Sequence, residues 1–120
     1  MRSIKVSRVQ RIMNKINSRT DFTHKLSDSP SRYVVTYKKI WSGKNPSINT
    51  GISYKLVDII ESGFYDSIGG WKNKKTGDYF VGANLHFESM KLALQTAQLL
   101  EQIAIHDLEV NKTYYLNKNE

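Results

Sequence analysis

The sequence predicts an α+β fold, in which an antiparallel sheet of about five strands is packed by helices and preceded by a basic amphipathic helix. A hairpin pattern over residues 67–87 predicts two paired strands of the sheet, and a helical period over residues 90–101 predicts the helix that packs on it. Apolar residues also repeat at helical spacing near the N-terminus. With 120 residues, we expect one domain, 1–120.

The first expected element is a helix over residues 4–16. Its apolar residues, Val9, Ile12, Met13 and Ile16, form one stripe. Two interpretations remain open: a packed helix with a solvated back, or a face that binds phosphates or an acidic partner. A stripe without aromatic residues disfavours binding at a membrane surface. The basic residues of the adjoining face are Lys5, Arg8, Arg11, Lys15 and Arg19.

A polar connector is expected between this helix and the rest of the chain. Residues 20–32 are rich in Ser, Thr and Asp and include Pro30, a composition typical of loops. We therefore expect a basic helix in residues 1–19 that moves relative to an α+β body in residues 33–117. Truncation of the helix should then leave the body folded.

The body begins with a strand and a short helix. Residues 32–41 alternate aromatic or β-branched side chains with polar ones, which favours a strand. After a loop over residues 42–51, Ser53 is placed to cap a helix that runs to residue 62, and Gly63 to end it in the left-handed conformation. An apolar run this short is also compatible with a strand.

The second half of the body carries the clearest signals. Residues 67–71 and 79–87 flank the turn sequence KNKKTGD and predict a hairpin with its loop at 72–78. Ser89 is a candidate N-cap for the helix over residues 90–101. The final expected elements are a strand at 103–106, a turn at 108–112 and a strand at 113–116.

Charge is distributed unevenly along the chain. All five arginines lie in the first 32 residues, and residues 1–48 hold 11 Lys and Arg against 2 Asp and Glu. Residues 49–120 hold 7 Lys and Arg against 9 Asp and Glu. The excess positive charge behind the formal net charge of +7 therefore lies in the first 48 residues. Such an end can meet nucleic acid, a headgroup or an acidic protein.

Catalytic and metal-binding patterns are not found in the sequence. There is no cysteine, and His24, His86 and His106 lack the spacings that place two metal ligands together. If residues 103–106 extend as a strand, His106 and Asp107 point to opposite faces. No Gly-rich phosphate loop or nucleophile elbow is present. We therefore expect a protein that is not an enzyme and has no cofactor or metal.

Two groups of lysines beside aromatic residues are the remaining binding candidates. Rings next to cations can stack on bases while the cations contact phosphates, although lysines at a turn also serve solubility and Trp71 can equally fill the core. One shared basic face is expected if both groups bind. The groups are Lys72, Lys74 and Lys75 with Trp71 and Tyr79, and Lys38, Lys39 and Lys44 with Tyr37 and Trp41.

Residues 68–116 carry a resemblance to a known class. The strings IGGW, KTGDYFV, LALQTAQLL with its AxxxA, QIAIHDL and YYL resemble a pattern of small accessory proteins of phages and prophages, some of which counter bacterial defence. Within this class, a likeness to the Thoeris anti-defence sponges implies sequestration of a cyclic nucleotide signal. Nucleotide pockets favour arginine, and residues 33–120 contain none. The resemblance then implies anion contacts from Lys72, Lys74, Lys75 or the N-terminal arginines.

Together these features predict a small non-enzymatic binding protein of phage accessory or anti-defence type. We expect it to engage nucleic acid, or a nucleic-acid-bound host complex, through its basic surface. Two alternatives stay open: a homo-oligomeric sponge for a nucleotide ligand, and an inhibitor that binds an acidic host protein. No segment is long and apolar enough to cross a bilayer, so we expect the cytoplasm, that of the host if phage-encoded, and no membrane partner.

Overall fold

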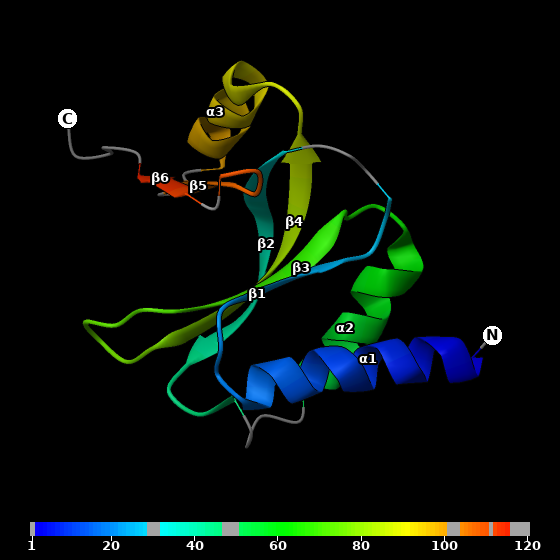
Figure 1. Cartoon of the computed structure of the whole chain (residues 1–120). Coiled ribbons are helices and arrows are strands. Elements are labelled where there is room, and N and C mark those ends of the chain that lie inside the picture. The colour runs from blue at the N-terminus through cyan, green and yellow to red at the C-terminus, as the bar shows by residue number, and fades with distance from the viewer. Residues whose placement is uncertain (1, 29–31, 47–50, 101–103, 111, 116–120) are drawn as a thin grey trace.

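The computed structural model describes residues 2–28, 32–46, 51–100, 104–110 and 112–115, with only the backbone of residues 2–7, 104, 113 and 115. Within these residues the chain forms one antiparallel sheet of six strands in the order β1-β3-β4-β2-β5-β6, with three helices (Figure 1). The predicted α+β class is confirmed. The strands are β1 Phe22–Lys25, β2 Tyr33–Gly43, β3 Ser67–Lys72, β4 Tyr79–Phe87, β5 Ala104–Asp107 and β6 Lys112–Tyr115; the helices are α1 Arg2–Asn17, α2 Gly51–Ser62 and α3 Met90–Leu99.

The predicted hairpin is formed by β3 and β4, which lie between β1 and β2 in the sheet. Its register pairs Ser67 with Asn84 and Lys72 with Tyr79, so the loop spans residues 73–78. Residues directly opposite each other in an antiparallel pair share a face of the sheet. The register therefore decides which side chains of the hairpin enter the core.

Both hydrophobic clusters lie on one face of this sheet. The larger one joins α1 and α2 to Ile68, Tyr79, Val81 and Ala83, which alternate along β3 and β4. The smaller one joins α3 to β2 and β5, and Phe87 continues the same alternation of β4 into it. In Figure 1, α3 lies near one end of the long strands, while α1 and α2 lie near the other. The opposite sheet face carries no member of either cluster among the described residues.

Helix α1 is part of the larger cluster. Ile12 and Ile16 are each 0% exposed, and Val9 is buried with them against α2 and β3. The predicted apolar stripe is therefore correct. Its burial contradicts the expectation of a mobile helix on a connector, because moving α1 away would expose these side chains to water.

The connector contains a strand that the sequence did not predict. β1 pairs with β3, with Phe22 opposite Gly70 and Lys25 opposite Ser67. Just before it, the buried Tyr79 hydroxyl donates to Thr20 O at 2.6 Å, and burial raises the pKa of this hydroxyl. This segment is thus fixed to the sheet. Helix α1 is therefore held by its own packing in the core and by the paired strand that follows it.

Strand β2 is longer and less regular than predicted. Its register against β4 shifts between Thr36 and Lys38, and again between Lys39 and Trp41. A bulge places two successive residues opposite one partner, which lets neighbours point to the same side. Ile40 is buried in the larger cluster and Trp41 packs against it, as the second shift allows.

A buried ion pair ties β5 to the start of β2. Arg32 donates from Nε and Nη2 to the two Asp107 oxygens at 2.7 and 2.8 Å, and its Nη1 lies 2.9 Å from Glu109 Oε1. The hydrogen bond from Arg32 lowers the pKa of the fully buried Asp107 carboxyl. Arg32 therefore supports the fold and does not extend the basic end of the chain.

The remaining elements match the predictions closely. The Ser89 side chain caps α3 by accepting from Leu92 N, and Gly63 follows α2 with φ +67°, which a residue with a side chain adopts rarely. Helix α2 begins at Gly51, so Ser53 lies inside its first turn and is not its cap. The predicted ends of the last helix and last strand, at residues 101 and 116, lie outside the described residues.

Candidate functional site

Four basic side chains meet where α1 lies beside the edge strand β1. Lys15 Nζ is 3.2 Å from His24 Nδ1 and 5.7 Å from the centre of the Phe22 ring. Since an ammonium group has no acceptor, Nδ1 of a neutral His24 accepts this hydrogen bond. We call Arg8, Arg11, Lys15 and His24 the basic cluster.

The pKa of His24 shows how these charges act on one another. Burial lowers it from its ordinary value of 6.5, and the positive charges of Lys15, Arg8 and Arg11 lower it further. In the described part of the chain, no carboxylate forms an ion pair with Arg8, Arg11 or Lys15. The basic cluster is therefore a site of uncompensated positive charge, which an anion would stabilise.

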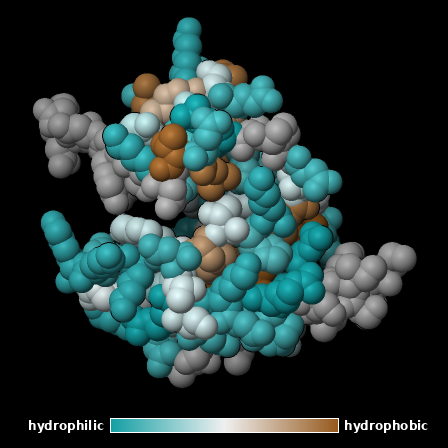
Figure 2. Space-filling model, viewed as in Figure 1, coloured by the Kyte–Doolittle hydropathy of each residue, from teal (hydrophilic) through white to brown (hydrophobic). Residues whose placement is uncertain are grey.

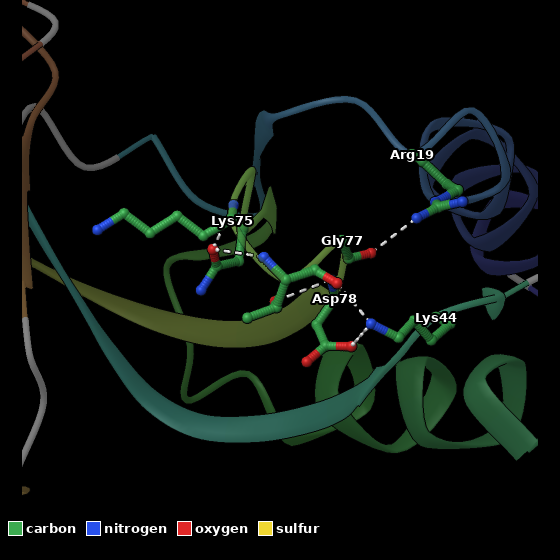
Figure 3. A network of polar contacts seen from close by, with 7 residues as sticks. Arg19, Lys44, Lys75, Gly77 and Asp78 are labelled. Carbon is green, nitrogen blue, oxygen red and sulfur yellow. Dashed lines mark hydrogen bonds and ion pairs between the residues drawn. The ribbon is translucent and has the colours of Figure 1, made fainter.

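Two other basic residues bind the loop of the β3–β4 hairpin and are not part of the basic cluster (Figure 3). Arg19, at φ +56° just after α1, donates from Nη2 to Gly77 O at 2.8 Å. Lys44, which follows β2, donates to Thr76 O and lies 3.2 Å from Asp78 Oδ1. Both cations thus support the fold. The side chain of Lys5, the remaining candidate on α1, lies outside the described residues.

The hairpin loop is ordered by its own turn chemistry. Asn73 Oδ1 accepts from Lys75 N and Thr76 N, Gly77 N donates to Asn73 O, and Gly77 adopts φ +81°. The three lysines of this hairpin, Lys72, Lys74 and Lys75, are exposed. Lys75 points away from the contacts of Arg19 and Lys44 in Figure 3. The loop therefore presents lysines on a fixed backbone.

Of the three aromatic residues predicted to stack on a ligand, only Trp71 is available. It is 38% exposed and lies against Phe80, with ring centres 5.5 Å apart and planes at 32°. Tyr79 is fully buried because it alternates with Val81 and Ala83 on the core face. Trp41 packs against the same core and lies over Gly43. The expected roles of Tyr79 and Trp41 are therefore not supported by their positions.

Lys38 and Lys39 are both exposed, but they do not share a face. Lys38 is opposite Ala83, on the side of the helices, whereas Lys39 is opposite Gly82, on the side of Trp71. The expected single basic face therefore includes at most one of these two lysines. In Figure 2, the surface over α1 and the hairpin is mainly hydrophilic, while hydrophobic side chains gather over α3.

A buried polar network, not predicted from the sequence, lies on the sheet face that carries Trp71. Thr36 donates to Asn84 Oδ1 at 3.0 Å, Asn84 Nδ2 donates to Ser67 Oγ at 3.0 Å, and Ser67 Oγ is 2.7 Å from His86 Nε2. Burial lowers the pKa of His86, which favours a neutral ring that accepts from the Ser67 hydroxyl. The Ser67 side chain is fully buried, so its oxygen is not presented to a substrate.

Two partly buried histidines, His24 and His86, make the stability of the protein depend on pH. His24 and His86 both have pKa values below the ordinary 6.5, so the unfolded chain binds protons more readily than the folded one. Their contribution is complete above pH 6.5 and is lost as the pH falls below it. We expect the free energy of unfolding, measured by urea titration, to be lower at about pH 5.5 than at about pH 7.5, mostly through His86, because water screens His24.

The variant His86→Gln provides the control for this prediction. It removes the buried titrating group, so it should flatten most of the pH dependence while lowering stability at both pH values. Equal stability of the unaltered protein at the two pH values would contradict the lowered pKa of His86.

Comparison with known proteins leaves the site to be interpreted from its geometry. No family model matches the chain, and no curated protein or solved structure shows significant similarity to it. Within the described residues, no group of three or more His, Asp or Glu side chains could hold a metal ion. None of the helices described is long and apolar enough to span a membrane.

Proposed function

We propose that this chain is a small non-enzymatic binding protein, of phage accessory or anti-defence type, that engages nucleic acid or a nucleic-acid-bound host complex. The observation that carries this proposal is the basic cluster on α1 and β1. Its cations lower the pKa of His24 and lack carboxylate partners in the described residues. A phosphate backbone would relieve this repulsion and release its own counterions.

Packing of α1 makes the basic cluster a fixed surface. Burial of Ile12 and Ile16 sets the rotation of α1, and Lys15 is further positioned by His24 and Phe22. The cations are thus in place before a ligand arrives, and binding does not have to order a helix. This arrangement favours a polyanion that runs along the edge of the sheet.

The hairpin lysines can extend this surface. Lys72 follows Trp71 at the end of β3, and its backbone N–H donates to the carboxylate of Asp21, which lies just before β1. The chain between α1 and β1 thus connects the basic cluster to the hairpin. Lys72, Lys74 and Lys75 are candidate further phosphate contacts, with less positional restraint than those on α1.

Binding to labelled DNA and RNA oligonucleotides tests the proposal. We expect the logarithm of the association constant to fall linearly with the logarithm of salt concentration, with a slope of about −2 to −3 for three phosphate contacts. Fluorescence anisotropy at four salt concentrations measures this slope. An absence of binding to both nucleic acids at low salt would refute the proposal.

Of the two alternatives, the nucleotide sponge is weaker on geometric grounds. A nucleotide sponge needs cations around a pocket, yet Arg19 and Arg32 already contact Gly77 O and Asp107 within the protein. An acidic protein partner would use the same basic cluster as a nucleic acid. Pull-down from host lysate with and without nuclease separates these cases, because only a direct protein partner survives the nuclease.

A further inference from the structure

The sheet face opposite the helices carries an aromatic pair that neither hydrophobic cluster includes. Trp71 and Phe80 are register partners on β3 and β4, and both lie on the face shared by Ser67 and Asn84. The alternate residues of these strands pack on α1 and α2. In the described residues, the core contacts of the three helices lie on the other face, although Ser67, Asn84 and His86 are buried on this one. We call it the open face.

The open face has a level floor beside the aromatic pair. Gly69 and Gly82 are opposite each other, one pair further along the strands from Trp71 and Phe80. A Cβ atom at Gly82 would lie 2.6 Å from Thr36 Cγ2, and one at Gly69 would lie 2.9 Å from Asn84 Nδ2. The polar network therefore fills the space above both glycines. The side chains of Thr36 and Asn84 therefore form this floor, next to the rings of Trp71 and Phe80.

Exposed lysines lie on both sides of this floor. Lys39 is opposite Gly82 on β2, and Lys25 is opposite Ser67 on β1. Lys72 follows Trp71 in the chain, but it is opposite Tyr79, so its side chain belongs to the other face. Two acidic residues also lie near this area: Asp21, whose carboxylate accepts from Lys72 N at 3.0 Å, and Asp66, whose carboxylate accepts from His86 N at 2.8 Å. Lys39 and Lys25 thus provide two positions for phosphates on the open face.

We infer that the open face binds single-stranded nucleic acid, with an unpaired base stacked on Trp71 beside Phe80 and with phosphates at Lys39 and Lys25. The inference rests on the proposed function and specifies its ligand. An exposed ring accepts the flat side of any base, whereas a duplex hides those sides between neighbouring pairs. The basic cluster alone would bind both forms through phosphate, so the open face supplies the preference for a single strand.

Replacement of Trp71 tests this inference. Stacking on an aromatic ring contributes about 1–3 kcal/mol per base, so Trp71→Ala should weaken binding of a single-stranded oligonucleotide by about 5- to 150-fold. Its effect on a duplex of the same length should be less than about twofold, because phosphate contacts remain. Anisotropy titrations with both ligands, under the same salt conditions, measure the ratio.

Two further variants separate stacking from other effects. Trp71→Phe keeps a ring and should retain most of the affinity, while the quenching of tryptophan fluorescence by the bound single strand should disappear with it. Tyr54→Ala removes an aromatic residue that is 76% exposed on α2 and should change neither affinity. Thermal melts of all variants show whether the fold is kept.

The outcomes distinguish failure of the inference from failure of the proposed function. Unchanged single-strand affinity in Trp71→Ala, with binding still sensitive to salt, would overturn stacking on the open face and leave the proposed function intact. Equal losses for single strand and duplex would also overturn it. If the unaltered protein binds neither ligand at low salt, the proposed function itself is wrong.

Discussion

We expect the double substitution Ile12→Ala and Ile16→Ala to leave most molecules unfolded. Each side chain is fully buried between α1, α2 and the sheet. Removing a buried isoleucine side chain to alanine typically lowers the free energy of unfolding by about 2–5 kcal/mol. The pair therefore removes about 4–10 kcal/mol, comparable with the total of about 5–15 kcal/mol for an ordinary domain.

Urea unfolding followed by circular dichroism measures this loss. The matched control is Gln10→Ala, an exposed position on the same helix, where alanine keeps helix propensity and we expect a change below about 0.5 kcal/mol. Deletion of residues 1–20 should unfold the chain as the double variant does. Unfolding midpoints that stay unchanged would contradict the packing of α1 described above.

The double variant also tests the sequence-based expectation that the basic helix is separate from the hydrophobic core. Composition places a basic helix before a polar segment, and its apolar stripe is compatible both with a helix packed on the body and with a mobile helix. What decides between them is the sheet surface made by Ile68, Val81 and Ala83, which come from strands more than 50 residues later. Local patterns contain no information on whether such a surface exists opposite the stripe.

Elements whose signals lie in their own residues were predicted from the sequence. An element that forms only by pairing with a distant strand was not. The β3–β4 hairpin follows from the turn residues of 73–78, and α3 from its helical period and the Ser89 cap. β1 has only four residues in a polar stretch, and it is a strand because β3 offers its edge for pairing. Tertiary pairing of this kind outweighs local propensity.

The same distinction explains where the positions of the expected site residues differ from the prediction. Alternation along β4 already places Tyr79 with Val81 and Ala83, so its burial could have been predicted once the hairpin was assigned. The hairpin register likewise brings Ser67 opposite Asn84, which could have revealed the polar network. The side-chain direction of Trp41 could not have been predicted in this way, because it depends on a bulge in β2 that no turn residue indicates.

We expect the double charge reversal Arg8→Glu and Arg11→Glu to remove most nucleic-acid binding while leaving the fold intact. Both residues lie on α1 outside the buried stripe, and the described residues offer them no carboxylate partner. Losing two phosphate contacts and adding two repulsive charges should weaken binding at low salt by roughly 100-fold or more. The slope of the logarithm of the association constant against the logarithm of salt concentration should also become less steep, by about 1.4–1.8.

A variant with the same change in net charge provides the control. Lys91→Glu with Lys112→Glu alters two exposed positions on α3 and β6, so it should weaken binding far less than the reversal on α1. An equal loss in the two variants would mean that net charge, and not the basic cluster, drives binding. An unchanged affinity in the α1 variant would exclude the basic cluster as the interface.

The α1 variant also has a readout that does not depend on any ligand. Because the positive charges of Arg8 and Arg11 help to lower the pKa of His24, replacing them with carboxylates should raise that pKa, and histidine resonances followed by NMR titration measure it. A raised pKa of His24 together with lost binding would show that the arginines lie where the structure places them and that the ligand uses the same charges. A raised pKa with full binding would confirm the geometry of the basic cluster but assign recognition to another surface, of which the open face around Trp71 is the first to test.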